Sequence, residues 1–390
     1  VDATAASHSP SPGSAASASL GPPRKRHHAS RSPAATTVPP SLSPSSTVAA
    51  TPSTSPASTP SPSHSVAPSP SSSPAAALPR FRIATLYYEP EERAKWKDGY
   101  GAALDLLAQD HEVDWVRLSG SDVRPVELMP RLLLADIIIV KSGYGWFVDE
   151  WARKHLRHSE VRSRLVLALS SIIPPANANG SLSYVLYYYE TDWHLEYMGA
   201  ARFSRHTPLV KAFGINGDYY YNAEARVPGF KQPKLWDAIF TGHIYEAMKH
   251  PLDLVNVTGA RLAVGPVDDT DWETVRQLRE GGVDVIAGSV LSEDVGALYR
   301  LSRLTQMHSM DWGGGERTVL ESRACGVPVD VLPENPKLVR LAALPTVPDH
   351  VEYATALLVG VCVVTGRCPA EHPSLGAAWQ TRVVYGTGDF

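Results

Sequence analysis

The stretch from Met310 to Val329 reads MDWGGGERTVLESRACGVPV, and it decides the fold. Three glycines precede a helical segment that stops at Gly326, and the apolar residues after that glycine predict a strand. Glycines before a helix let a ligand approach the backbone closely. The start of the helix offers free N–H groups and a partial positive charge, which suit a diphosphate. The stretch therefore predicts a loop, helix and strand that together bind an anion.

Two glutamates belong to this helical segment. Glu316 stands at its start, where the helix dipole favours a carboxylate, and Glu321 follows five residues later, so the two do not share one stripe. Glu321 could accept hydrogen bonds from the two neighbouring hydroxyls of a ribose. Taken alone, each feature has a simpler interpretation. Glu316 could only stabilise the helix dipole, Glu321 could be a solvated helix position, and the glycines could form an ordinary loop.

Strands and helices alternate on both sides of this stretch, which predicts an α/β fold with right-handed crossovers. In the second half, strands are expected at 236–241, 260–264, 283–287, 304–308 and 327–332, with helices at 251–257, 272–280, 292–299 and 316–324. In the first half, strands are expected at 81–88, 113–118, 135–141, 164–169 and 184–189, with helices at 96–109 and 147–158. We therefore predict two doubly wound, Rossmann-like domains facing each other across a cleft that binds the ligands.

Composition sets the boundaries of these domains. Of residues 1–78, 53 are Ser, Pro or Ala and none is Phe, Trp or Tyr. This segment lacks the apolar surface that must offset the entropy of folding, so it is predicted to be a disordered tail. We expect the first domain at 79–213 and the second domain at 236–345, with an interdomain linker at 214–235 between them. A C-terminal helix with its tail is expected at 346–390.

The segment 320–329, LESRACGVPV, resembles the donor-binding motif LEAxACGxPV of the glycosyltransferase group 1 (family-4-like) enzymes. The residues after it, 333–338, are similar to a DNPKL tail found in some members. The resemblance implies the GT-B fold and a nucleoside-diphosphate sugar as the donor. It also implies that Glu321 binds the ribose, and that Gly313, Gly314, Gly315 and Glu316 lie against the donor sugar and the diphosphate.

The sequence also departs from the family pattern. In the family, a strand ending in VGR and a following lysine hold the diphosphate; here Lys249 matches the lysine, and His243 replaces the arginine. The family often carries another glutamate eight residues before the ribose-binding one, and that position is Gly313. The resemblance further implies that Gly288 and Val290 belong to a loop whose backbone meets the base. An ordinary surface lysine and a histidine packed at a strand end remain the alternatives for the two phosphate positions.

The first domain carries candidates for the acceptor side. Glu190, Asp192 and His194 follow a strand that ends in three tyrosines, and Lys141 ends another strand of the same sheet. Aromatic rings beside carboxylates can hold a sugar, by stacking on its face and by hydrogen bonds at its edge. The alternative is a buried tyrosine-rich strand with a polar loop after it.

These observations predict a hexosyltransferase-like enzyme that moves a sugar from a UDP- or GDP-type donor to a glycan, lipid or protein acceptor, with the retention that the resemblance implies. Glu316, Lys249 and His243 are the predicted catalytic residues. No cofactor is expected, and no metal, because the acidic run 268–271 is interpreted as a cap of the following helix. Two other hypotheses stay open: a degenerate GT-B-like module that binds a sugar nucleotide or a partner without turnover, and a sugar-nucleotide epimerase.

Charge and composition exclude some classes of protein. Asp and Glu number 40 against 36 for Lys and Arg, which argues against a nucleic-acid-binding protein. No apolar run reaches about 18 residues and no signal-peptide pattern is seen, so no membrane span and a cytoplasmic location are expected. The three cysteines, Cys325, Cys362 and Cys368, predict neither a disulfide framework nor a zinc site.

Overall fold

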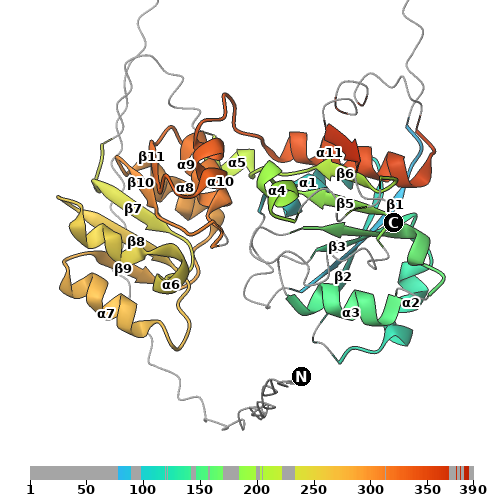
Figure 1. Ribbon diagram of the computed structural model, residues 1–390, viewed down its shortest axis with the longest axis horizontal. Coiled ribbons are helices and arrows are strands. Elements are labelled where there is room, and N and C mark those ends of the chain that lie inside the picture. The colour runs from blue at the N-terminus through green and yellow to red at the C-terminus, as the bar shows by residue number, and fades with distance from the viewer. Residues whose placement is uncertain are drawn as a thin grey trace, which may run out of the picture. The chain divides into compact units, whose positions relative to one another are not determined.

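The computed structural model describes residues 78–88, 98–118, 120, 122–141, 146–156, 159–169, 184–198, 203, 205–221, 233–311, 313–368, 375, 378 and 382–385. The tail predicted at 1–78 lies outside these residues, apart from its last one. The described residues form two α/β sheets, each covered by helices (Figure 1).

The first sheet has the order β12-β6-β5-β4-β3-β1-β2, and only the β12–β6 pair is antiparallel. Its strands are β1 (Arg82–Tyr87), β2 (Glu112–Arg117), β3 (Ile137–Lys141), β4 (Leu165–Ala168), β5 (Leu186–Tyr189), β6 (Pro208–Lys211) and β12 (Val383–Tyr385). The register sets Ile83 beside Val113 and Ile137. β3 is buried along its whole length, as expected of a parallel strand covered on both faces.

Alternate residues of β3 point to opposite faces and therefore enter different cores. Ile137 and Ile139 pack with α1 (Gly99–Leu107) and α11 (His350–Thr365), whereas Ile138 and Val140 pack with α2 (Pro125–Leu132) and α3 (Trp146–Leu156). The same two pairs of helices flank the sheet in Figure 1. The remaining helical elements of this part are η3 (Arg162–Arg164, a 3₁₀ turn), α4 (Asp192–Met198) and α5 (Gly217–Tyr220).

The second sheet is fully parallel, with the order β11-β10-β7-β8-β9. Its strands are β7 (Ala238–Thr241), β8 (Arg261–Gly265), β9 (Asp284–Ala287), β10 (Thr305–Met307) and β11 (Val329–Val331). Its helical elements are α6 (Glu246–Lys249), the 3₁₀ helix η6 (Pro251–Asn256), α7 (Trp272–Glu280), α8 (Ser292–Arg300), α9 (Glu316–Ala324) and α10 (Pro336–Ala342).

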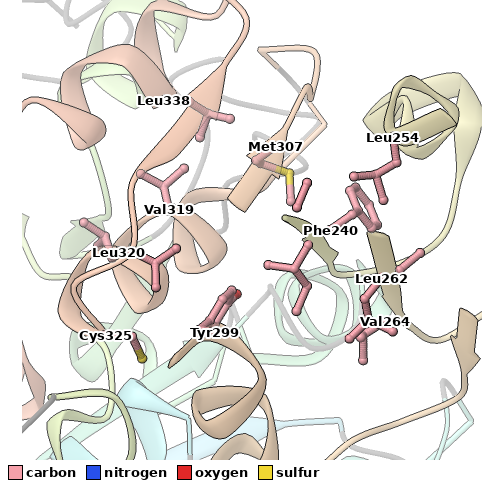
Figure 2. Close-up of a cluster of buried hydrophobic side chains, with 14 of the residues drawn as sticks. Phe240, Leu254, Leu262, Val264, Tyr299, Met307, Val319, Leu320, Cys325 and Leu338 are labelled. Carbon is pink, nitrogen blue, oxygen red and sulfur yellow. The ribbon is translucent and has the colours of Figure 1, made fainter. Parts of the chain in front are cut away.

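One hydrophobic cluster holds the second sheet to its helices (Figure 2). Phe240 of β7 and Met307 of β10 are fully buried, and so are Val319 of α9 and Leu338 of α10. Burying each such side chain stabilises the fold by roughly 1.5–3 kcal/mol. This cluster fixes the start of α9 against the ends of β7 and β10, where the candidate site lies.

After the second sheet the chain returns to the first. Tyr353 and Leu357 of α11 are buried in the first sheet's core, and the Tyr188 hydroxyl donates to the Leu357 carbonyl at 2.6 Å. A side chain at Gly360 would place its Cβ 2.2 Å from the Tyr188 hydroxyl oxygen, so glycine is required where the helix crosses this tyrosine. The first sheet is therefore built from both ends of the described chain.

The predicted fold class is confirmed, and some local predictions are wrong. Residues 192–198 form helix α4 rather than a loop, and helix α2, which contains Pro130, was not predicted. Cys362 and Cys368 form a disulfide, contrary to the expectation of none. Gly366 ends α11 in the left-handed conformation and turns the chain back, which brings the two Cα atoms to 5.3 Å.

None of the helices among the described residues is both long enough and apolar enough to cross a membrane.

Candidate functional site

The candidate site lies where the second sheet changes direction. β7 pairs with β8 on one side and with β10 on the other, so the chain leaves these neighbouring strands toward opposite edges. Such a switch point opens a crevice at the carboxyl ends of the two strands, and ligands of α/β sheets bind there. The loops after β7 and β10 are joined, because the Met310 amide donates to the Met248 carbonyl at 2.9 Å.

The glycine loop after β10 leads directly into α9. Gly314 and Gly315 have φ angles of 81° and 102°, in the left-handed region that favours glycine. A Cβ on Gly315 would lie 2.9 Å from the Met307 side chain beneath it. Like any helix, α9 leaves its first amides without acceptors inside the helix. The predicted anion-binding loop therefore has the required backbone geometry.

Gly313 cannot be replaced by the glutamate that the family often carries. A Cβ at this position would lie 2.4 Å from the Ser309 hydroxyl oxygen and 2.5 Å from the Met248 carbonyl oxygen. The backbone of the β10 loop thus packs directly on the β7 loop, and no side chain fits between them. A glycine at this position is therefore compatible with the packing of the two loops, and a glutamate is not.

Lys249 ends the short helix α6 beside the site. A Cβ on Gly242 would lie 3.2 Å from its Nζ atom, so the ammonium lies against the backbone at the end of β7. Burial lowers the pKa of Lys249 to about 8; Glu316 acts in the opposite direction, and the positive charges of Lys337 and Arg317 lower the pKa further. The lysine is therefore a cation held near other cations, and an anion bound there would stabilise its charged form.

His243 has a carboxylate partner. Its Nε2 lies 3.2 Å from the Asp268 carboxylate, and Asp271 brings a third ligand atom within 4.8 Å of the other two. Asp271 also precedes α7, but its side chain makes no capping hydrogen bond, so the predicted cap is not formed by this residue. These three groups could hold a cation, although the Asp268 side chain is 71% exposed.

Glu316 is not an open carboxylate. It is 2% exposed and forms an ion pair with Lys337, which is 1% exposed and places its Nζ 4.7 Å from the centre of the Trp193 ring. Asn335, the N-cap of α10 and two residues before Lys337, donates to the Ser309 carbonyl at 2.7 Å and so holds α10 to the glycine loop. Glu316, a predicted catalytic residue, is therefore buried, and its charge is compensated by Lys337.

Glu321 lies inside α9 at 6% exposure. Its carboxylate accepts from the Arg317 Nε at 3.3 Å and from the Tyr299 hydroxyl at 3.5 Å. Burial raises its pKa, and the Arg317 charge lowers it. Tyr299 also contacts the Thr241 hydroxyl at the end of β7, so Glu321 is tied to the same switch point as the glycine loop.

The loop after β9 carries the residues that are predicted to contact a base. Gly288 has a φ of 142°, and its amide donates to the Gly265 carbonyl at 2.8 Å. No atom of the described residues lies within 4 Å of a Cβ placed on it. Val290 is half-buried and packs against the hydrophobic cluster. The loop thus has an open backbone surface beside one apolar side chain; its contact with a base stays a prediction.

The first sheet brings two of the three acceptor-side candidates together. Glu190 and His194 are 9% and 1% exposed, and Lys141 Nζ lies 3.4 Å from the Glu190 carboxylate. Burial raises the pKa of Glu190, Lys141 and His194 lower it, and Glu316 raises it. Asp192 is instead at the surface, where both its oxygens lie 3.0 Å from Lys211 Nζ.

His194 has a polar atom without a partner. The Thr191 amide donates to its Nδ1 at 3.2 Å, so a neutral imidazole carries its proton on Nε2. Nε2 is buried and has no hydrogen-bond partner in the described parts of the chain. A buried donor without an acceptor costs roughly 1–3 kcal/mol of stability, so the Nε2 hydrogen of His194 is suited to bind the hydroxyl oxygen of a ligand.

Comparison with known proteins supports this architecture. No protein-family model matches the sequence, and no curated protein is similar to it. Among solved structures, AviGT4, a glycosyltransferase involved in avilamycin A biosynthesis, matches with a TM-score of 0.50 and 16% identity, over 73% of this chain and 98% of that chain. The fold is that of the GT-B glycosyltransferases.

HepE of Anabaena, solved in complex with UDP and glucose, also matches, with a TM-score of 0.47 and 14% identity over 77% of this chain and 95% of that chain. At such identities the GT-B likeness is a statement about the fold alone. The roles of individual residues in this GT-B chain therefore rest on the geometry given above.

Sequence reasoning missed two residues of the site. Both belong to the segment 333–338, for which the sequence predicted no role, yet Lys337 neutralises Glu316 and Asn335 anchors the loop. The run PENPKL carried a signal for Asn335 alone, since asparagine followed by proline is typical of the start of a helix. Nothing in the sequence placed Lys337 opposite a residue 21 positions earlier.

Proposed function

We propose that this chain is a glycosyltransferase that takes its donor, a nucleoside-diphosphate sugar, at the switch point of the second sheet. One observation carries the proposal: two left-handed glycines lead into the start of α9, and the Lys249 ammonium lies at the end of the neighbouring strand. A helix start and a cation around one crevice suit a diphosphate. Glu321 is proposed to bind the ribose.

The proposed reaction retains the anomeric configuration and needs no carboxylate base. The bond between the anomeric carbon and the diphosphate oxygen breaks, and a bond to the acceptor oxygen forms on the same face of the sugar. The acceptor proton passes to the departing diphosphate oxygen. Lys249 and the first amides of α9 stabilise the charge that develops on that oxygen, and His243, beside Asp268, is proposed to assist them.

The test uses a panel of UDP-, GDP- and ADP-sugars. We expect one donor to raise the melting temperature and to release nucleoside diphosphate, at an equal rate with and without EDTA. Lys249→Met should abolish the shift, while Lys154→Met, which removes a lysine from α3 of the first sheet, should not. No binding of any donor by the parent protein would overturn the proposal.

The ion pair at Glu316 favours a second candidate, a module that binds the donor without turnover. Its carboxylate is neutralised by Lys337, and Gly313 leaves no room for a replacement. Donor binding without release of nucleoside diphosphate, across a panel of sugar, lipid and peptide acceptors, would select this candidate over the transferase.

A further inference from the structure

A hollow of about 650 Å³ lies at the amino ends of the strands of the first sheet, where β1, β3 and β4 begin and α11 ends. Three arginines, Arg82, Arg164 and Arg367, line it together with a single carboxylate, that of Asp136. The candidate site residues lie at or beyond the carboxyl ends of strands, so this hollow is a separate feature.

Arg164 is held in place by the backbone. Its Nη1 donates to the Leu133 carbonyl at 2.9 Å and to the Ala135 carbonyl at 2.8 Å, where the chain passes from α2 to β3. A guanidinium carries five N–H donors, so the Nε and Nη2 hydrogens of this arginine remain for another acceptor.

The other two arginines are held differently, by ion pairs at side-chain exposures of 52% for Arg82 and 45% for Arg367. Arg82 donates through Nε to Glu112 at 3.0 Å, and the Arg367 guanidinium lies 4.7 Å from the centre of the Phe81 ring with its Nη2 2.8 Å from Asp136. Each of these contacts uses one part of the guanidinium, so every one of the three arginines keeps further N–H groups for a ligand.

Charge at the hollow differs in sign from that of the whole chain. Three guanidinium groups face two carboxylates, those of Asp136 and Glu112, which leaves a local charge of +1 in a chain of net charge −4. One Asp136 oxygen is already occupied, because the Arg82 amide donates to it at 2.8 Å. The hollow therefore has more donors than acceptors.

We propose that this hollow binds a phosphate group, and that the molecule carrying it also has an apolar part. The planar guanidinium of an arginine can donate two parallel hydrogen bonds to two oxygens of one phosphate. Leu133 and Leu134 are 40% and 63% exposed, and with Val364 they form an apolar side of the same hollow. The ligand is either a free phosphate ester or the headgroup of a membrane lipid.

The experiment measures binding of radiolabelled inorganic pyrophosphate to the full chain by equilibrium dialysis. Arg367→Gln should weaken the binding at the hollow about ten-fold, as expected for the loss of one charged hydrogen-bonding group. Arg303→Gln is the matched control, because Arg303 is an exposed arginine paired with a carboxylate in the second sheet. Lys249→Gln removes the pyrophosphate that binds at the donor site, and the pyrophosphate that binds in the hollow should remain.

A second variant avoids the anchored arginines. Leu134→Glu places a carboxylate beside the hollow and should weaken pyrophosphate binding, whereas Leu235→Glu, at a residue 57% exposed and outside the hollow, should not. Vesicles of phosphatidylglycerol and of phosphatidylcholine identify the source of the phosphate. Sedimentation with the anionic vesicles alone, lost in Arg367→Gln, supports a lipid headgroup; pyrophosphate binding without sedimentation supports a free ester. Equal pyrophosphate binding by the parent, Arg367→Gln and Leu134→Glu overturns the proposal.

Discussion

Replacing Lys337 by methionine should destabilise the second sheet strongly. Lys337 and Glu316 are 1% and 2% exposed and form one ion pair, and the lysine also lies over the Trp193 ring. Methionine keeps much of the length and the apolar stem but removes the ammonium. The Glu316 carboxylate would then be buried without its counter-charge.

The burial of this pair sets the magnitude. Removing one partner of a buried ion pair costs roughly 3–5 kcal/mol, whereas an exposed pair contributes only about 0–1 kcal/mol. The same helix offers the exposed comparison, since Arg340 of α10 pairs with Glu196 at side-chain exposures of 51% and 54%. Arg340→Met should therefore cost less than about 1 kcal/mol. The double variant Glu316→Gln/Lys337→Met should cost less than either single change, because no charge is left unpaired.

The assay is urea unfolding followed by tryptophan fluorescence, with the midpoint and the slope determined for each variant. A lower midpoint at unchanged slope for Lys337→Met, largely restored in the double variant, is the expected result. If Lys337→Met and Arg340→Met shift the midpoint equally, the Lys337–Glu316 ion pair does not stabilise the second sheet, and the reasoning is refuted.

Four further predictions concern the site and the ends of the chain. Glu321→Ala should weaken donor binding about ten- to a hundred-fold, with the exposed Glu280→Ala as a silent control; unchanged affinity would remove Glu321 from the ribose site. The pKa of Lys249 is about 8 and a bound diphosphate should raise it, so donor affinity should fall as the pH rises above 8, and Lys249→Arg should flatten this profile in calorimetric titrations from pH 7 to 9. Removing residues 1–77 should leave cooperative unfolding and donor binding intact by calorimetry; loss of either contradicts the predicted tail. Cys368→Ser opens a short loop closed with Cys362 and should lower the free energy of unfolding by about 2 kcal/mol in urea titrations; a reduced parent that unfolds at the oxidised midpoint would contradict this.

The second sheet was predictable because its local signals agree with its tertiary structure. Helices 272–280 and 316–324 have the bounds that the sequence predicts, since a glycine follows the last turn of one and the glycine loop precedes the other. The strands differ from their predicted limits by at most two residues at either end, because hydrogen bonding to the neighbouring strands, and not apolarity, decides where a strand stops. Alternation of buried strands and amphipathic helices was enough to predict the fold class.

Contacts between distant residues were not predictable in the same way. The partner of Glu316 is decided by how α10 packs on α9, and the partner of His243 by where the β8 loop turns. Asp192 and His194 are two residues apart, yet helix α4 turns one to the surface and the other inward. Only a three-dimensional arrangement separates such neighbours.

The return of α11 and β12 to the first sheet has a consequence for synthesis of the chain. The second sheet's cluster uses residues up to 347, whereas the first sheet's cores need Tyr353 through Leu357, Leu375 and the edge strand β12. A ribosome makes these residues only after it has made those of the second sheet. The first sheet is therefore begun before the second sheet and completed after it, and its Tyr188 face lacks a covering helix until α11 has been made.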